Sequence, residues 1–401
     1  MKNRNLITLL SGQFISTFGN NLLSIALPWF VYTMTHSKAD LAYVGIAQSL
    51  PALLGMVAGV FVDRWSKRQT MIVSDVIRMA ICLVLGAWSL LHPSLIPIVL
   101  LVFILQCVGA FFNPAAGALL PLIVPKENVP AAMGYEQSGT ATAQLVGTLS
   151  GGVLLTLLSA PLLFFSDGIS FLLSAISLLF IRIKEKYVQR TIHSEPPSFR
   201  REFLSGLAMF RKSRFLILSL VGVLIANFAF APLDLALTAW VKGNLGGSAS
   251  ALGMINAAFF LGMIIGGVLL GRISKIISLR MLFLWSLAIA GALVICIGLL
   301  PNVLWDALIT LCIGFVVGTL NGGFGAVATG CIPEELRARA WGTIGSLSAL
   351  TVPIGMVVGG IWMTHLALAN VFLVVGCLSI VASLPFLLPV KQDLQAIGVA
   401  S

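Results

Sequence analysis

The sequence predicts an all-α integral membrane protein in which twelve transmembrane helices form two pseudo-symmetric six-helix bundles. Three observations predict this fold class: a very apolar composition, a dozen apolar stretches long enough to cross a membrane, and a repeat that relates the two halves of the chain. Of the 401 residues, 58% are hydrophobic and 9% are charged, whereas about 25% of an ordinary soluble domain is charged. A soluble protein of this composition would have too few polar residues to cover its surface, but lipid requires no such cover.

A membrane-spanning helix needs about 20 predominantly apolar residues, and polar or Pro/Gly-containing breaks separate the stretches that meet this requirement. The first stretch carries polar residues through its middle and is not followed by a small-residue cleavage site. We therefore interpret it as a retained helix and not as a signal peptide. The predicted spans are 6–34, 43–62, 70–91, 95–119, 134–158, 162–182, 215–240, 250–271, 280–300, 304–325, 340–364 and 369–389.

The positions of the basic residues predict the orientation, because loops rich in Lys and Arg stay on the cytoplasmic side of a membrane. With a cytoplasmic N-terminus, only Lys38 and Lys242 of the 24 Lys and Arg residues lie on the outside. Both termini are therefore expected in the cytoplasm. The same asymmetry explains the net charge of +10, since basic residues at that surface contact anionic lipids. We expect no nucleic-acid partner.

One long polar connection, residues 184–214, divides the predicted helices into two sets of six. Within it, the apolar residues of 199–212 would share one face of a helix, which predicts a short amphipathic helix on the membrane surface. The predicted parts of the chain are a first six-helix bundle at 1–183, a cytoplasmic linker at 184–214, a second six-helix bundle at 215–390 and a cytoplasmic tail at 391–401.

The two halves share residues at a fixed offset of 208 positions. Repeated halves joined by a linker are how many secondary transporters build a central site that opens alternately to the two sides of the membrane. The repeat therefore favours a secondary transporter. The matching pairs are Gly59/Gly267, Arg64/Arg272, Lys67/Lys275, Asn113/Asn321, Pro125/Pro333, Glu127/Glu335, Gly134/Gly342, Gly147/Gly355, Gly151/Gly359 and Gly152/Gly360.

Between the second and third predicted spans lies the segment G-V-F-V-D-R-W-S-K-R, from Gly59 to Arg68. Gly59 would let two helices approach closely, and Asp63 would accept hydrogen bonds from a neighbouring helix N-terminus. Arg64, Lys67 and Arg68 would hold the loop at the cytoplasmic lipid surface. A plain basic turn is the alternative interpretation.

The same segment resembles the signature loop of the major facilitator superfamily, Gly-x-x-x-Asp-Arg-x-x-x-Arg with a basic residue allowed late. The resemblance implies the major facilitator fold and a latch that stabilises the outward-open state. The second half holds a partial copy in Gly267, Arg272 and Lys275, but Gly271 replaces the acid. The latch is therefore expected to act mainly in the first half.

Three further segments narrow the resemblance: L-P-L-I-V-P-K-E-N-V-P-A-A-M-G-Y-E-Q-S at 120–138, A-L-P-W-F-V-Y at 26–32 and V-P-I-G-M-V-V-G-G at 352–360. They are similar to the drug-proton antiporter branch of that superfamily, which includes bacterial macrolide-efflux proteins, and the similarity covers nearly the whole chain. It implies proton-driven export of lipophilic or amphiphilic compounds across the bacterial inner membrane. The implied partners are a small-molecule substrate, protons and membrane lipids, and the implied state is a monomer without cofactor or metal.

Two departures from that branch concern proton coupling. The fourth helix of such exporters usually carries a buried arginine linked to coupling, whereas the fourth predicted span here has no arginine and offers Gln106 near that place. The fifth span carries Gly147, Gly151 and Gly152 but lacks the proline that the branch places between its glycines.

An ionised side chain at the centre of a membrane helix costs about 2.5–3.5 kcal/mol, so each one is a functional hypothesis. Asp234, in the outer part of the seventh span after Pro232, is a candidate protonation or substrate-charge site, or else a hydrogen-bonded structural acid near the outer interface. Glu136, near the cytoplasmic end of the fifth span, is the second candidate for proton coupling, or else a helix cap that faces cytoplasmic water.

The other intramembrane charges are expected to be structural. Asp75 and Arg78 lie one turn apart on the third span, where a local ion pair near the latch is expected. Asp167 and Asp306 lie close to outer helix ends, where a solvated or capping role is expected.

Uncharged polar residues on six of the predicted helices are candidates for the wall of a substrate cavity. Each of them alternatively joins two helices by a hydrogen bond, which is worth about 0.6 kcal/mol on average in a membrane. The candidates are Gln13, Asn20, Asn21, Gln106, Asn113, Gln144, Asn227, Asn256 and Asn321.

Other function classes find little support in the sequence. It contains no G-x-x-x-x-G-K-[ST] phosphate loop and no H-E-x-x-H pair, so neither an intrinsic ATPase nor a zinc hydrolase is indicated. The six cysteines lie singly, without a C-x-x-C spacing, so no metal site is expected. A sensor or scaffold would not need polar residues in both halves. The main alternative is a dedicated exporter of one metabolite, such as a siderophore or peptide.

Overall fold

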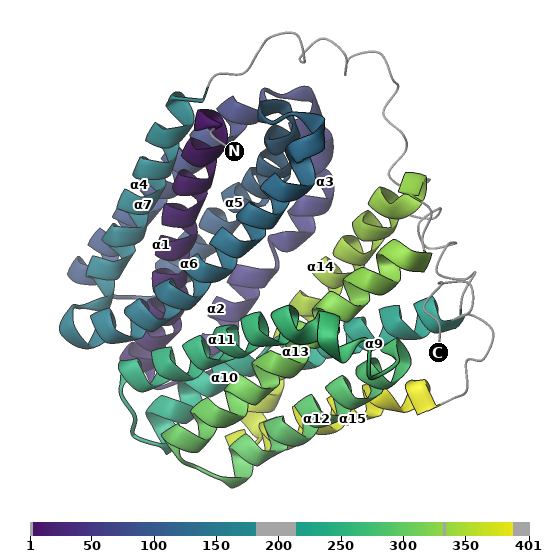
Figure 1. The fold of residues 1–401 in the computed structure, drawn as a ribbon. Coiled ribbons are helices and arrows are strands. Elements are labelled where there is room, and N and C mark those ends of the chain that lie inside the picture. The colour runs from purple at the N-terminus through teal and green to yellow at the C-terminus, as the bar shows by residue number, and fades with distance from the viewer. Residues whose placement is uncertain (1–2, 182–213, 332–333, 388–401) are drawn as a thin grey trace. The chain divides into compact units, whose positions relative to one another are not determined.

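A computed structural model of the chain (Figure 1) describes residues 3–181, 214–331 and 334–387. The regular structure of these residues is entirely helical, which confirms the predicted all-α class. Nearly all of the predicted linker at 184–214, with the amphipathic helix expected in it, and the whole predicted tail at 391–401 lie outside the described residues.

The helices agree closely with the predicted spans, because long apolar stretches are a local signal. Eleven helical segments in the described part of the chain are long and apolar enough to cross a membrane. The helices are α1 (Arg4–Thr35), α2 (Lys38–Ser49), α3 (Ala52–Arg64), α4 (Lys67–Leu91), α5 (Leu95–Ile123), α6 (Val129–Leu157), α7 (Ala160–Leu179), α9 (Arg214–Phe230), α10 (Leu233–Ala239), α11 (Ala249–Ile273), α12 (Leu279–Leu299), α13 (Val303–Cys331), α14 (Glu334–His365) and α15 (Leu368–Ser383).

Two of the predicted spans are not continuous helices. The span predicted at 43–62 is divided into α2 and α3 next to Pro51, and the span predicted at 215–240 is divided into α9 and α10 next to Pro232. Proline lacks the N–H group that a helix interior requires, and its ring collides with the preceding turn. After α10, the chain continues into a π-helical turn at Trp240–Asn244.

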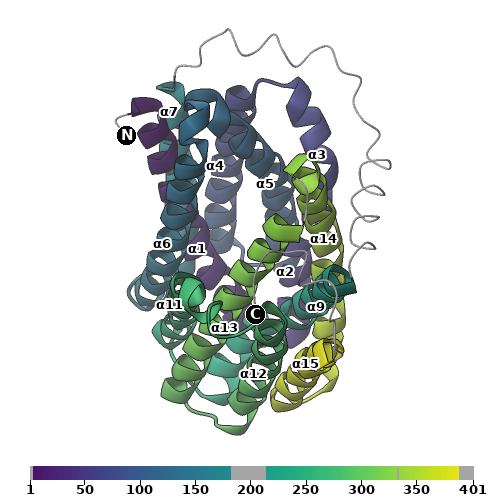
Figure 2. The ribbon, with the colours of Figure 1, turned by 45° about the vertical axis from the view of Figure 1, so that its right-hand side comes forward.

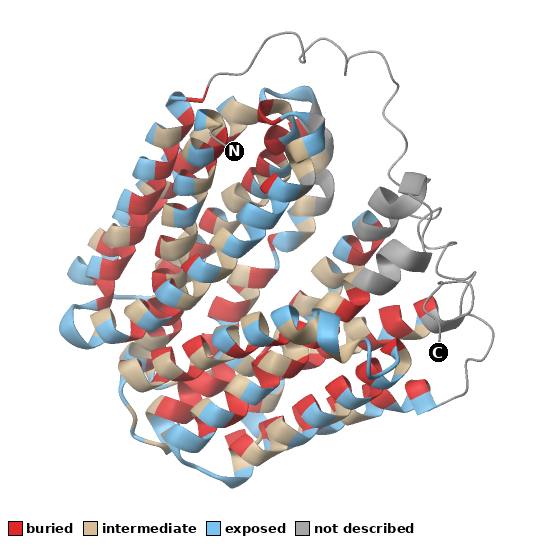
Figure 3. Cartoon of the chain, in the orientation of Figure 1, coloured by how far each residue is buried: buried red, intermediate tan, exposed pale blue. Residues whose placement is uncertain are grey.

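The chain forms two compact units: Met1–Pro196 with Ser248–Ala257, and Pro197–Gly247 with Ala258–Ser401. In the first unit, α4 packs against α7, and α1 packs against both α6 and α7, as Figures 1 and 2 show. In the second unit, α12 packs against α15 and α9 against α14. Buried side chains form stripes along the helices, and exposed side chains occupy the opposite faces (Figure 3).

The repeat seen in the sequence corresponds to equivalent helix pairs within each unit. A Cβ at Gly147 of α6 would lie 2.8 Å from the carbonyl oxygen of Phe18 in α1, and a Cβ at Gly355 of α14 would collide with the carbonyl oxygen of Phe228 in α9. Both positions need glycine because the two helices approach so closely. A Cβ at Gly59, by contrast, would meet no described atom within 4 Å, so the close approach expected there is not found.

A second equivalent pair corrects the predicted register. In α7, Gly168 packs on Met79 and Leu83 of α4, while in α15 its counterpart Gly376 packs on Gly291 and Ile295 of α12. The helices α7 and α15 keep the offset of 208, but α4 and α12 are related by an offset of 212. The unbroken register expected from the sequence therefore ends before α12, because the connection between α11 and α12 is longer than that between α3 and α4.

The corrected register makes Arg68 equivalent to Arg280, and the two make the same contacts. Arg68 donates from Nε and Nη2 to the carbonyl oxygens of Leu178 and Leu179, at 2.8 and 2.7 Å. Arg280 donates in the same way to Phe386 and Leu387, at 2.6 and 2.7 Å. Each arginine thus donates to carbonyl groups in the last turn of a helical segment, where few intrahelical N–H groups remain to satisfy them.

We predict that Arg68→Ala and Arg280→Ala each lower the free energy of unfolding by about 1.5–3 kcal/mol, the range for hydrogen bonds to charged groups. The two effects should be similar because the geometry is the same. Thermal unfolding of the purified protein in detergent measures both, with the exposed Lys275→Ala as the control. An unfolding temperature equal to that of the control in both arginine variants would contradict this capping role.

Candidate functional site

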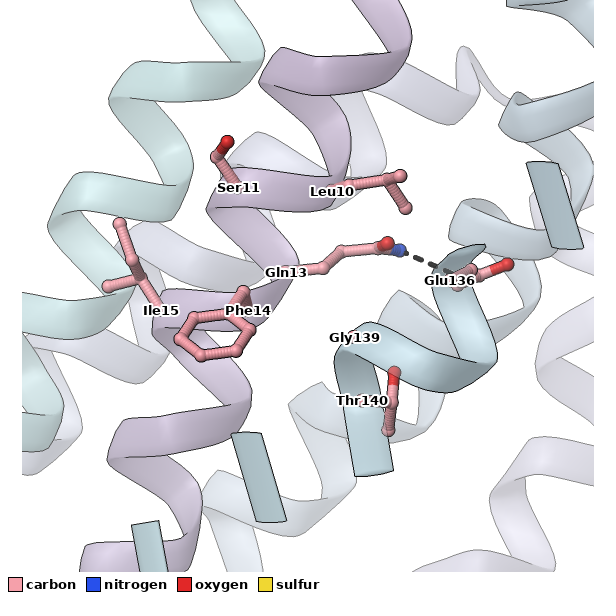
Figure 4. A pocket seen from close by; sticks show the side chains of 8 residues that line it. All are labelled: Leu10, Ser11, Gln13, Phe14, Ile15, Glu136, Gly139 and Thr140. Carbon is pink, nitrogen blue, oxygen red and sulfur yellow. Dashed lines mark hydrogen bonds between the residues drawn. The ribbon is translucent and has the colours of Figure 1, made fainter. Parts of the chain in front are cut away.

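The first unit contains a cavity of about 440 Å³ between α1 and α6 (Figure 4). Its wall is mostly apolar, with a few polar side chains at defined places. Such a combination is typical of small-molecule sites, where apolar walls supply affinity and a few polar groups fix orientation. The lining residues are Leu10, Ser11, Gln13, Phe14, Ile15, Glu136, Gly139 and Thr140.

Gln13 and Glu136 face each other across this cavity, as Figure 4 shows. Gln13 Nε2 donates to Glu136 Oε1 at 3.4 Å, a long bond that leaves the carboxylate free to accept others. Gln13 Oε1 is buried and accepts no hydrogen bond from a described residue. The cavity therefore offers one carboxylate, an acceptor that suits a cationic or hydrogen-bond-donating group on an otherwise apolar molecule.

A second cavity of about 740 Å³, also in the first unit, lies among residues of α3, α4 and α5. Arg64 of the predicted latch lines it, next to Trp65, whose ring stacks on Phe111 with centroids 6.1 Å apart. Lys67 donates to the carbonyl oxygen of Trp65 at 3.3 Å. The side chain of Asp63 is not among those described, so the latch stays a prediction.

Three charged side chains of the first unit lie inside the packed helices, and none of them lines either cavity. Arg78 of α4 is 7% exposed, and Asp75, one turn before it, is fully buried. Their side chains form the expected ion pair, with Arg78 Nη1 3.7 Å from Asp75 Oδ1. Arg78 also reaches beyond α4, because Nη2 donates to Asn20 Oδ1 of α1 at 3.0 Å and the guanidinium lies 3.8 Å from the ring centroid of Phe171 in α7.

Asp167 of α7 belongs to the same region. It is fully buried and interacts electrostatically with Arg78. Its carboxylate accepts hydrogen bonds from Ser170 Oγ at 3.1 Å and from Cys82 Sγ at 3.7 Å. A Cβ at Gly19 of α1 would collide with Ser170, so the lack of a side chain at Gly19 makes room for this group.

The solvated or capping roles expected for Asp167 and Asp306 are wrong. Asp306 is also fully buried, and Trp240 Nε1 donates to its Oδ2 at 3.1 Å. Nearness to a helix end in the sequence does not decide burial, because the neighbouring helices can cover the end of a span. The partners of these two acids, Arg78 and Trp240, lie on other helices. No local sequence pattern could therefore have revealed that the acids are buried.

The predicted cavity residues fall into three groups. Asn21 and Asn227 join helices, since Asn21 accepts from Thr148 of α6 at 3.5 Å and Asn227 donates to Ser348 of α14 at 3.0 Å. Asn20 accepts from Arg78, and Gln13 meets Glu136, as described above. The rest are Asn113 and Asn321, which are exposed, and Gln106, Gln144 and Asn256, which are partly exposed.

Asp234, the other candidate for proton coupling, lies in the first turn of α10, directly after the break at Pro232. Its side chain is exposed. Thr238 Oγ1 donates to its backbone carbonyl oxygen at 3.1 Å. Asp234 belongs to the second unit, and its role in coupling stays a prediction.

Comparison with known proteins identifies the family. The model of the Major Facilitator Superfamily matches residues 9–235 and 219–396. The chain belongs to the major facilitator superfamily. Macrolide efflux protein A of Streptococcus pyogenes is 26% identical over 93% of each chain, and the staphyloferrin B transporter of Staphylococcus aureus is 26% identical over 93% of this chain and 89% of its own.

A crystal structure of a POT family transporter in complex with 5-aminolevulinic acid has the same fold, with a TM-score of 0.75 at 15% identity over 98% of this chain and 97% of its own. As a member of the superfamily, the chain is a multi-pass membrane transporter.

We predict that Glu136→Gln weakens binding of tetraphenylphosphonium, a lipophilic cation, to this superfamily member by about tenfold, or about 1.4 kcal/mol. The substitution keeps the size of the side chain and removes the only charge among the described residues that line this cavity. Equilibrium dialysis of the purified protein measures the change, with Glu127→Gln, an exposed acid outside the cavity, as the control. Equal affinity in the two variants would show that the carboxylate of Glu136 does not attract the cation.

Proposed function

We propose that the protein is a secondary-active exporter that moves lipophilic or amphiphilic small molecules out of the cytoplasm by alternating access, in antiport with protons. The observation that carries this proposal is the cavity between α1 and α6. Its apolar wall and its single carboxylate, Glu136 opposite Gln13, suit a bulky apolar molecule with one basic or hydrogen-bond-donating group.

The superfamily supports the remaining parts of the proposal. Members with repeated halves rock these halves around a central site, and this chain repeats its α1–α6 packing in α9–α14. The named similarity to a macrolide efflux protein agrees with an amphiphilic substrate. The distribution of Lys and Arg supports cytoplasmic termini in the bacterial inner membrane, and the apolar outer faces support lipid contact by a monomer.

A dedicated exporter of one metabolite is the second candidate, favoured by the similarity to a staphyloferrin B transporter. An anionic metabolite would need basic side chains in its site. The described lining of the α1–α6 cavity contains a carboxylate and no basic group. The cavity therefore favours neutral or cationic compounds over an anionic metabolite.

We predict that inside-out vesicles containing the protein accumulate erythromycin or ethidium when their interior is acidic, and lose that accumulation when nigericin collapses the pH gradient. An anionic dye should be tested in the same vesicles as the comparison compound. Vesicles prepared without the protein are the control. Accumulation of the anionic dye alone would contradict the proposed substrate class, and accumulation that survives nigericin would contradict proton antiport.

A further inference from the structure

Asp75, Arg78 and Asp167, here called the charged cluster, carry one positive and two negative formal charges in a buried place. Among the described residues, the helices packed around the cluster supply no further charged side chain to it. Asn20 faces it from α1, Cys82 from α4, and Ser170 and Phe171 from α7. On α5, which has no charged residue, a Cβ at Gly109 would lie 3.7 Å from Arg78 Nε and 3.9 Å from Gln106 Oε1, so the helix backbone passes close to the guanidinium there.

One guanidinium cannot neutralise two ionised carboxylates. If both acids were ionised, a net charge of −1 would remain inside the membrane, at a cost of several kcal/mol. A single proton on either carboxylate removes this excess charge. Two acids that share one partner in this way titrate as a coupled pair, and the proton belongs to the pair and not to one residue.

The contacts within the charged cluster leave it room to rearrange. Arg78 Nη1 lies 3.7 Å from Asp75 Oδ1, which is beyond the usual length of a charge-assisted hydrogen bond. Ser174 of α7 lies near the carboxylate of Asp75, yet neither oxygen of Asp75 nor the Nε of Arg78 makes a hydrogen bond of ordinary length with a described residue. A static ion pair selected for stability would satisfy these buried groups. The guanidinium forms its ion pair with Asp75 and also interacts electrostatically with Asp167.

The second unit shows that packing alone does not require these charges. In the register given by the glycine contacts, Leu287 and Ala290 of α12 occupy the places of Asp75 and Arg78, and Val375 of α15 occupies that of Asp167. All three are buried, with exposed fractions of 1%, 2% and 0%. The same helix pair therefore packs with apolar residues, and apolar replacements of buried ion pairs are often neutral or stabilising.

We propose that the charged cluster is the site at which the protein binds the proton that it exchanges for its substrate. One proton from water on one side of the membrane binds to the carboxylate of Asp75 or Asp167, Arg78 pairs with the carboxylate that stays ionised, and the proton leaves to water on the other side. This inference rests on the proposed proton antiport and moves the site of coupling from Asp234 and Glu136 to helices α4 and α7.

Infrared spectroscopy of the purified protein without substrate tests the proton site directly. The C=O band of a protonated carboxyl group should disappear between acidic and alkaline buffer in the wild type, and the same band should be missing in both Asp75→Asn and Asp167→Asn. Asp306→Asn, which removes a buried acid outside the charged cluster, should keep it. Retention of the band in either cluster variant would overturn the shared site.

The variant Asp75→Leu/Arg78→Ala/Asp167→Val copies the second unit and is expected to fold, with an unfolding temperature no lower than that of the wild type. In vesicles it should lose pH-driven accumulation of ethidium but retain exchange of labelled for unlabelled ethidium. Full pH-driven accumulation by this variant would overturn the proposal. If the wild type does not transport ethidium, the proposed substrate class fails, while the infrared result still decides whether the charged cluster holds a proton.

Discussion

A guanidinium buried among membrane helices is the constraint around which the first unit is organised. Arg78 contacts Asn20 of α1 and Phe171 of α7 in addition to Asp75 on its own helix, and it lies next to the backbone of α5 at Gly109. Each contact replaces part of the hydration that the charge loses on burial, and lipid cannot supply a substitute. The positions of four helices are thus tied to one side chain, and a change in its pairing would be felt by all of them.

The two units solve the same packing problem with different chemistry. Glycines let α6 approach α1 and α14 approach α9, and paired arginines satisfy the ends of α7 and α15. The interface between α4 and α7 nevertheless carries charges, whereas that between α12 and α15 is apolar. This asymmetry supports an interpretation in which the first unit holds the charged cluster and the cavity of Glu136, whereas apolar residues take the places of the cluster in the second unit.

The sequence predicted the features that depend on local composition. The apolar spans were predictable because hydropathy is summed over each stretch. The helix breaks at Pro51 and Pro232 were not predictable in the same way, since a proline does not always break a helix: Pro28 and Pro353 lie within continuous helices. The sequence also identified Gln13 and Glu136 individually, but their pairing across 123 positions depends on how α1 meets α6.

The charged cluster was beyond prediction for a related reason. Asp75 and Arg78 were expected to form a local pair, and that pair is present. Whether Asp167 joins them depends on which face of α7 meets α4. The residues that replace the charged cluster in the second half could not be identified from the sequence either, because the longer connection before α12 shifts the repeat by four positions.

In the proposed antiport, substrate export and proton movement are obligatorily coupled. Proteoliposomes loaded with a pH-sensitive dye and given an outward-directed erythromycin gradient, with no initial pH difference, test it most directly. We predict that the interior of the proteoliposomes acidifies as erythromycin leaves, because protons enter in exchange, and that unreconstituted liposomes show no such change. Efflux of erythromycin through the protein with no change in internal pH would contradict it.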